Sequence, residues 1–421
     1  MFSSPFLRYD DANMLTKTSA LAKDLVLAKK TLLEDWKSGA QGWMGCPEEK
    51  MLEARISKLA SEKRKKFKTC LVIGIGGSDL GARAGWHALK HEAKGMRLEF
   101  LGGNTDPDEI EWTLKSLDLK TTLVNIISKS GDTLEPMATF AVLRDRLQRL
   151  VGSRYAEQVV ATTDEEKGSL HALAVQESYA MLPVSNNIGG RFSVLTAVGL
   201  FPLACAGIDI KKMLAGAKQV RDEYVAGDAK KHDAARYAAH HVLGDLKEHR
   251  PIHILMPYSE RLRVFGQWYR QIWAESLGKD DKGPTPIAAL GATDQHSQIQ
   301  DYNQGAKDKL ITFIEVEHFS SKLKAPRIAA DMPTIQDISN MPFERIIHAE
   351  RQGTAQALTK SGRPNGTLHL SKIDSATLGG LFMFFEIVTG IAGSLYGINT
   401  YNQPGVEEGK KLMRQILKNG V

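Results

Sequence analysis

Cysteine is scarce in this sequence of 421 residues: there are three, Cys46, Cys70 and Cys205, and none belongs to a C-x-x-C pair. Three cysteines cannot all pair within one chain, so a disulfide framework is not indicated and a reducing compartment is favoured. The same spacing argues against a structural zinc site. We therefore expect a cytoplasmic protein with no bound metal.

Long apolar runs are also rare, and residues 378–398 form the one that is long enough to span a bilayer. Glu386 lies in its middle, where a charge costs about 2.5–3.5 kcal/mol on membrane insertion. No second such run exists, and the N-terminus lacks the charged start and apolar stretch of a signal peptide. The run is predicted to be a buried core helix, and no membrane partner is expected.

The charge excess is small, with a net charge of +6 and a pI near 8.9. The densest basic run, residues 63–66, fits the solvated end of a helix. A mild basic excess suits an anionic substrate and is too small to indicate nucleic acid as a partner.

Secondary structure follows from the spacing of apolar residues. Residues 12–66 have helical spacing, and strand-like runs then alternate with helical stretches. This alternation predicts the α/β class, with parallel sheets covered by helices on both faces. The pattern occurs in two blocks, which suggests two similar domains with a boundary between residues 206 and 228. The expected strands are residues 69–75, 97–102, 121–127 and 158–163 in the first block, and 252–257, 285–290 and 310–316 in the second.

Two polar loops follow strands of the first block, where parallel sheets bind ligands. The first, GIGGSDLG at residues 74–81, lacks the G-x-G-x-x-G spacing of a dinucleotide site. Its glycines still let the backbone approach an anion, unless it is simply a tight turn capped by Ser78 or Asp79. The second, SKSGDT at residues 128–133, groups hydroxyls, amides and Lys129 as a phosphate site requires, or else caps a helix. Asp132 would repel a phosphate, so it is expected to point away and cap the next helix.

Four further segments contain candidate catalytic groups. Arg191 follows paired glycines and suits an enediolate or phosphate oxygen. Gln271 and Glu275 share a helical face, so Glu275 could act as a base. His296 begins a helix after a strand, and residues 401–411 form a turn and helix start with further polar groups. Each of these alone has an ordinary structural explanation. The pair His240-His241 lacks metal-ligand spacing and is read as a helix surface.

Taken together and in this order, the motifs resemble the glucose-6-phosphate isomerase family, whose members have two sugar-isomerase (SIS) domains. The resemblance covers residues 70–412 and is strongest in IGGRFSVLTAVG and YNQPGVEEGK; GIGGSDLGAR, SKSGDT, AESLGK and DQHS complete it. It implies two SIS-type doubly wound domains with helical N- and C-terminal extensions. The implied limits are 1–66 for the N-terminal helical extension, 67–206 and 207–373 for the two SIS domains, and 374–421 for a C-terminal helical arm that completes the active site.

The resemblance implies reversible isomerisation of glucose 6-phosphate and fructose 6-phosphate through an enediolate, in glycolysis and gluconeogenesis, with no cofactor. In catalysis, Glu275 matches the base, Arg191 the group that stabilises the enediolate, and His296 and Lys410 the groups that open the sugar ring. In the family this histidine comes from the partner subunit, which implies a homodimer with shared active sites. The residues that match substrate-binding positions are Gly77, Ser78, Ser128, Lys129, Ser130, Thr133, Gln271 and Gln403.

Two departures from the family pattern are Asp132, where a hydroxyl residue is usual, and NTYNQ in place of NPFDQ. Three alternatives stay open at this point. A module that only senses a sugar phosphate would need SKSGDT but not the four catalytic candidates together. An isomerase that also accepts mannose 6-phosphate is poorly separated by sequence. A nicotinamide-dependent dehydrogenase is disfavoured by the missing fingerprint.

Overall fold

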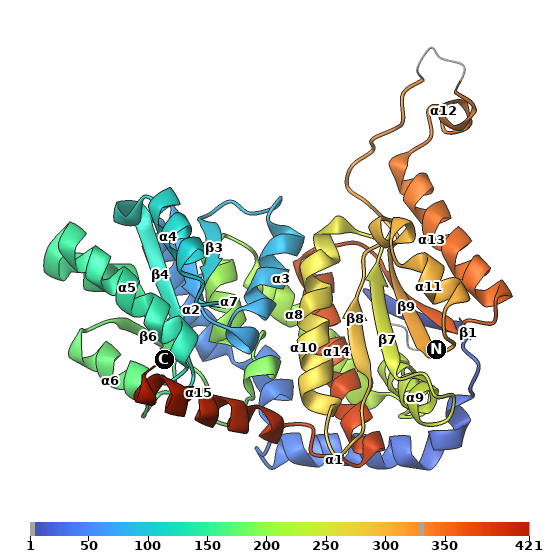
Figure 1. Ribbon diagram of the computed structural model, residues 1–421, viewed down its shortest axis with the longest axis horizontal. Coiled ribbons are helices and arrows are strands. Elements are labelled where there is room, and N and C mark those ends of the chain that lie inside the picture. Colours follow the sequence, from blue (N-terminus) through green and yellow to red (C-terminus); the bar gives the residue numbers. More distant parts are fainter. Residues whose placement is uncertain (1–4, 328–331, 421) are drawn as a thin grey trace.

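The computed structural model describes residues 5–327 and 332–420, which form two α/β lobes side by side (Figure 1). The first lobe has a five-stranded parallel sheet in the order β3-β2-β4-β5-β6. Its strands are β2 (Thr69–Ile73), β3 (Arg97–Leu101), β4 (Thr122–Ile127), β5 (Val159–Thr163) and β6 (Ala180–Pro183).

The second lobe has a sheet in the order β1-β10-β9-β7-β8, in which β1 is antiparallel to β10 and the other pairs are parallel. Its strands are β1 (Leu7–Asn13), β7 (Ile252–Pro257), β8 (Thr285–Ala288), β9 (Lys309–Val316) and β10 (Asn365–Leu370). The predicted α/β class is thus confirmed, and both sheets are parallel except for the antiparallel edge strand β1.

Helices cover both faces of each sheet. In β2, Cys70 and Val72 face one hydrophobic core while Leu71 and Ile73 face another, because successive side chains of a strand point to opposite faces. The helices are α1 (Ala22–Lys37), α2 (Lys50–Arg64), α3 (Leu80–Leu89), α4 (Pro107–Ser116), α5 (Leu134–Val151), α6 (Ser169–Gln176), α7 (Ala197–Cys205), α8 (Ile210–Ala226), α9 (Asp233–Leu246), α10 (Arg263–Leu277), α11 (Ile299–Gln304), α12 (Pro333–Asp337), α13 (Phe343–Lys360), α14 (Ser375–Tyr396) and α15 (Glu407–Asn419).

The apolar run near the C-terminus forms α14, and 89% of its most apolar window is buried inside the protein. It packs against α1, α8, α9 and α10, so it joins elements of both lobes. The prediction of a buried core helix is therefore confirmed. Glu386, at its centre, is completely buried, and neither carboxyl oxygen has a hydrogen-bond partner in the described part of the chain.

The reading of His240-His241 as a helix surface is wrong. Both side chains are buried, because α9 lies between β1 and α14. The Nε2 atom of His240 is 3.0 Å from Asp11, and the Nε2 atom of His241 is 3.2 Å from the Thr312 hydroxyl. The local sequence showed only that the two residues are polar. Tertiary packing buries them inside the second lobe, where Asp11 and Thr312 provide their hydrogen-bond partners.

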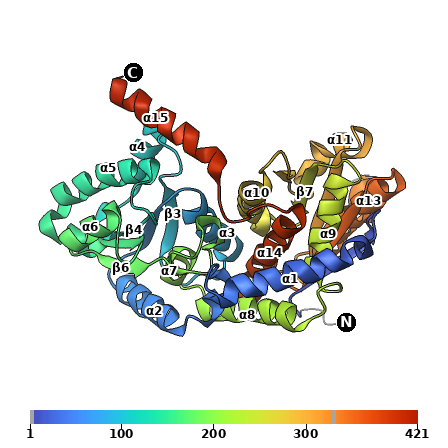
Figure 2. The same cartoon turned by 90° about the horizontal axis from the view of Figure 1, so that it is seen from below.

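The N-terminal region is helical from α1 onward, as expected, but begins with β1, an edge strand of the second sheet. The predicted boundary region contains α8, which packs along α14. The domain limits 67–206 and 207–373 stay a prediction. At the far end, α15 extends away from the body of the protein beside the first lobe (Figure 2), and none of its described residues is buried.

Candidate active site

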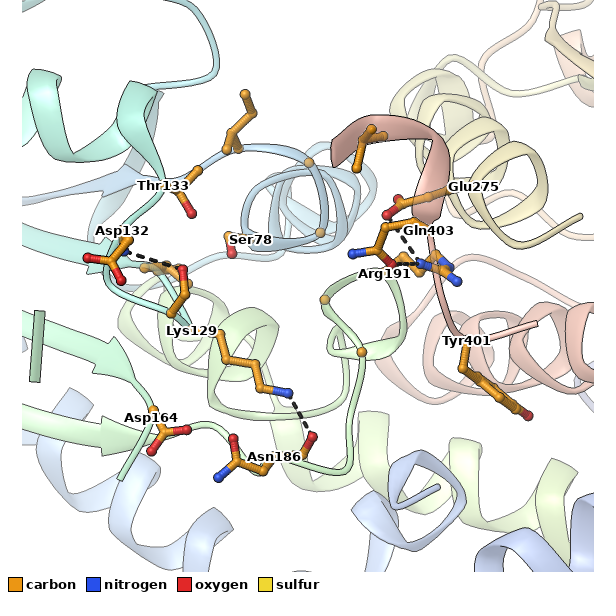
Figure 3. Close-up of a pocket in the computed structure, with 18 of the residues that line it drawn as sticks. Ser78, Lys129, Asp132, Thr133, Asp164, Asn186, Arg191, Glu275, Tyr401 and Gln403 are labelled. Carbon is orange, nitrogen blue, oxygen red and sulfur yellow. Dashed lines mark hydrogen bonds and ion pairs between the residues drawn. The ribbon is translucent and has the colours of Figure 1, made fainter. Parts of the chain in front are cut away.

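A cavity of about 1030 Å³ opens at the carboxyl ends of β2, β4 and β5, where the first lobe meets α10 and the C-terminal segment (Figure 3). Ten of the twelve predicted site residues line it, and the two exceptions are Ser128 and His296. The ten are Gly77, Ser78, Lys129, Ser130, Thr133, Arg191, Gln271, Glu275, Gln403 and Lys410.

The loop after β4 forms one end of the cavity. Ser128 is buried behind it, where its hydroxyl accepts the Gly131 N–H at 3.1 Å and donates to the Thr133 hydroxyl at 3.2 Å. Ser128 therefore holds the loop in shape, while Ser130 and Thr133 present polar atoms to the cavity. Hydroxyls and amides in this arrangement suit the oxygens of a phosphate.

Lys129 brings a positive charge to the same end of the cavity. Its ammonium donates to the carbonyls of Asn186 and Ile188, at 2.9 and 3.0 Å (Figure 3). Burial lowers the pKa of this ammonium. These bonds tie the loop after β4 to the segment that precedes Arg191.

Asp132 does not cap α5, contrary to expectation. The N-cap position of that helix is Thr133, and its cap has no side-chain hydrogen bond. Instead, Asp132 lines the cavity and accepts a hydrogen bond from the Ser169 hydroxyl at the start of α6. The donor, Ser169, is the first residue of α6, which is distant from Asp132 in the sequence. Local sequence therefore could not show this contact.

The glycine-rich loop after β2 lies against the loop that contains Arg191. A Cβ atom at Gly77 would approach the Gly190 carbonyl oxygen to 2.2 Å, so no side chain fits there. Gly76 has a φ of +58°, and a Cβ there would lie 2.9 Å from the amide nitrogen of Gln271. Both glycines are therefore required for the close approach of three chain segments at the floor of the cavity.

Arg191 is the centre of the site and is only 3% exposed. Its Nη1 atom donates to Glu275 at 3.1 Å and to Gln403 at 2.6 Å (Figure 3). The other guanidinium N–H groups donate to the Ser276 hydroxyl at 2.7 Å and to the carbonyls of Thr400 and Asn402 at 2.6 and 3.0 Å. Burial lowers the pKa of Arg191, while the charge of Glu275 opposes that shift.

Glu275 is held from two sides. Gln271, one helical turn earlier on α10, donates to its second carboxyl oxygen at 3.0 Å. The Glu275 side chain is 27% exposed and faces the cavity. A carboxylate fixed beside a buried cation can remove a proton from carbon and leave the resulting negative charge next to the guanidinium.

Two ring-opening candidates are placed differently. Lys410 lies on α15 at the rim of the cavity, with its ammonium 2.9 Å from Glu407. His296 lies in a short 3-10 helix of the second lobe (Thr293–His296), is exposed, and does not line the cavity. One chain therefore brings together eleven of the twelve predicted residues in or behind the site.

A second cavity of about 590 Å³ lies beside the first and shares Gln271, Glu275 and Gln403 with it. Arg270 and Lys279 add positive charge to its wall. Glu275 thus lies between two openings.

Sequence reasoning missed several residues of the site. Asp164 and Lys167 follow β5 and could have been found, since they continue the rule that ligands bind after strand ends. Ser276 and Tyr401 lack a local signal, because their roles arise from contact with the Arg191 loop. Within residues 5–327 and 332–420, no group of three His, Cys, Asp or Glu residues could hold a metal ion.

Comparison with known proteins gives consistent matches. The family model of phosphoglucose isomerase matches residues 51–326 and 337–420. A glucose-6-phosphate isomerase of Rubrobacter xylanophilus is 40% identical over 392 residues, covering 91% of this chain and 89% of that protein. A probable glucose-6-phosphate isomerase of Methanococcus maripaludis is 39% identical, covering 85% of this chain and 80% of that protein.

Solved structures agree with these matches. A hypothetical protein of Thermus thermophilus has a TM-score of 0.90 at 32% identity, covering 98% of this chain and 99% of that one. A glucose-6-phosphate isomerase of Chlamydia trachomatis has a TM-score of 0.86 at 24% identity, covering 99% of this chain and 89% of that one, which shows a shared fold. With the fold, the cavity and these relatives in agreement, the chain belongs to the phosphoglucose isomerase family.

Proposed function

We propose that this protein interconverts glucose 6-phosphate and fructose 6-phosphate. The observation that supports this most directly is the pairing of Glu275 with buried Arg191 at one end of a cavity whose other end is the loop of Ser130 and Thr133. A sugar phosphate has its anionic group at one end and its carbonyl at the other. The two ends of the cavity match that order.

The reaction follows from the placement of these groups. Glu275 takes the proton from C2 of the open-chain aldose, and the electron pair forms the C1–C2 double bond of an enediolate. Arg191 stabilises the oxygen that gains charge. Glu275 then returns the proton to C1, while a proton passes between the oxygens on C1 and C2. The proposed reaction moves protons and leaves the overall oxidation state of the substrate unchanged. A base and a cation are therefore sufficient for it, and side chains supply both.

Binding at the phosphate end fixes the distance to the base. The hydroxyls of Ser130 and Thr133, the loop amides and the charge of Lys129 hold the phosphate, while Gln271 and Gln403 orient the carbonyl end. Holding the substrate in this way converts remote binding energy into correct alignment at C1 and C2.

Ring opening requires a proton donor and acceptor near the ring oxygen. Lys410 lies at the rim of the cavity, but His296 of the same chain lies outside it. We propose a homodimer in which His296 of a second copy enters beside Glu275. The second cavity, open on that side of Glu275, supports this arrangement. The protein is proposed to act in the cytoplasm, without nucleic acid or membrane partners.

The test is direct conversion of fructose 6-phosphate by the purified protein, with EDTA present and no NAD added to the isomerisation step. A coupled dehydrogenase reads glucose 6-phosphate in a separate step, and mannose 6-phosphate is tried in parallel. Conversion that survives EDTA supports the proposal. Sugar-phosphate binding without conversion would instead identify a sensor.

A further inference from the structure

A short turn between α10 and β8 is tied to the C-terminal segment by two lysines. The turn spans residues 278–283 and is closed by hydrogen bonds between Lys279 and Lys282 in both directions, at 3.2 and 2.9 Å. Lys279 donates to the carbonyls of Asn399, at 2.6 Å, and Ser276, at 2.9 Å. Lys282 donates to the carbonyl of Tyr396, the last residue of α14, at 3.0 Å.

The two lysines bind different parts of the C-terminal segment. Lys282 binds a carbonyl at the end of α14, where helix carbonyls lack partners and a cation is favourable. Lys279 donates to the carbonyl of Asn399. The next carbonyl along the chain, that of Thr400, accepts a hydrogen bond from Arg191. Lys279 and Arg191 therefore bind consecutive carbonyls of the same loop, those of Asn399 and Thr400.

The two cations also meet at Ser276. Arg191 donates to its hydroxyl, and Lys279 donates to its carbonyl. The loop ends at Gln403, which accepts from the same Nη1 atom that faces Glu275. Loss of the Lys279 contacts would free the start of the loop at Asn399. The rest of this loop, up to Gln403, provides hydrogen-bond acceptors for Arg191.

We propose that Lys279 is a positioning residue of the isomerase site, which fixes the 399–403 loop on the end of α10 and thereby aligns Arg191 with Glu275. This inference rests on the proposed function, because its consequence is measured in that reaction. Lys279 does not have to touch the substrate for this role.

The environment of Lys279 provides a signature. Burial, and next the charge of Arg191, lower the pKa of its ammonium to about 8, against the attraction of Glu275 and Asp280. These are the charged groups that face it, from the Arg191 loop, from α10 and from its own turn. Above that pH the neutral amine still reaches Asn399, but its hydrogen bonds lose the assistance of charge.

The experiment compares Lys279→Met, Lys279→Arg and the matched control Lys282→Met in both directions of the isomerisation, over pH 6–10. Lys279→Met is expected to lower kcat about 10- to 100-fold and KM less than threefold, because a displaced Arg191 weakens transition-state stabilisation more than substrate binding. Lys282→Met is expected to keep kcat within about threefold, since it loses only a helix-end contact.

Lys279→Arg keeps its charge at alkaline pH. We expect it to restore much of kcat and to move the alkaline fall in kcat, near pH 8 in the wild type, upward by at least about one unit. If Lys279→Met does not fold, this shift alone decides the matter. Unchanged kcat in Lys279→Met, or an alkaline limb that Lys279→Arg leaves in place, overturns the inference. An inactive wild type would refute the proposed function instead.

Discussion

Arg191 uses all five of its N–H donors within one chain, although it lines the cavity that we propose binds the substrate. Four of the five bonds go to the protein's own framework or to Gln403, and the fifth goes to Glu275. Nη1 bonds the two side chains that line the cavity, Glu275 and Gln403, so a substrate oxygen that approaches this atom has to share or replace one of them. The guanidinium is therefore oriented before the substrate arrives.

The proposed role of Glu275 as the base is tested by Glu275→Gln, which keeps the shape and the contact with Arg191 but cannot accept a proton. We expect kcat to fall by at least about 10²-fold, because a general base contributes about 10²–10⁴-fold. Circular dichroism and thermal unfolding serve as controls for folding. Near-normal turnover in a folded variant would show that another group is the base.

Asp132 faces the cavity beside the proposed phosphate loop, where a carboxylate repels a dianion. Asp132→Thr is expected to lower KM for fructose 6-phosphate about 3- to 10-fold with little change in kcat, a gain of about 1 kcal/mol that is typical of one exposed charge. The effect should shrink at high salt. Asp132→Glu, the charge-conserving control, should leave KM near the wild-type value; a higher KM in Asp132→Thr would mean that the carboxylate assists binding.

At the scale of elements, α14 combines an apolar surface with one buried carboxyl group. Burial raises the pKa of Glu386 well above its ordinary value. The folded state therefore keeps its proton while the unfolded state loses it above about pH 4.5. The stability that this proton provides is present below pH 4.5 and is lost as the pH rises toward the folded-state pKa.

Glu386→Gln removes this titration without changing the size of the side chain. We expect the melting temperature of the variant relative to the wild type to increase from pH 5 to pH 8, with little gain at pH 4.5. Glu386→Met should show the same trend and a larger gain, because an apolar side chain removes the cost of burying a carboxyl group that has no hydrogen-bond partner. A gain that is independent of pH would show that Glu386 has the same pKa in the folded and unfolded states, which contradicts the prediction.

The sequence predicted those elements whose pattern is set by burial. The strands β2, β4, β5, β7 and β9 are short apolar runs with nearly every residue buried, so their periodicity was sufficient. The strands β1, β6 and β10 were missed. LRYDDAN is polar at an edge, AMLP is only four residues long, and NGTLHL begins with a turn-like Asn-Gly. β1 and β10 pair with each other although they are far apart in the sequence, and no local pattern indicates such a pairing.

The residues that line the cavity were also predicted only where a local sequence pattern marks them. Polar loops that follow a strand, such as Ser128–Thr133, could be placed at the cavity because strand ends gather at one edge of a parallel sheet. Ser276 and Lys279 were not found, since their contacts depend on how α10 meets the 399–403 loop. His296 lies outside the cavity of its own chain, so its proposed role requires the second copy of the proposed homodimer.

At the scale of the whole molecule, shared sites can be tested by mixing two inactive variants, Glu275→Gln and His296→Asn. If His296 acts across the interface, a mixed dimer contains one intact site, and random re-assortment of equal amounts should recover about a quarter of wild-type activity. Each variant re-assorted with itself is the control. No recovery, with mixed dimers verified by mass spectrometry, would place His296 in the site of its own chain.

The pairing of β1 with β10 has a consequence for how the chain is made. Leu7 lies opposite Leu370, so β1 leaves the ribosome long before its partner strand and cannot join its sheet until the chain has been translated through β10. At about 5–20 residues per second, that strand waits on the order of tens of seconds, while the strands of the first lobe are already complete. This edge of the second sheet can thus close only after β10 has been translated, and the strand that closes it is made long before.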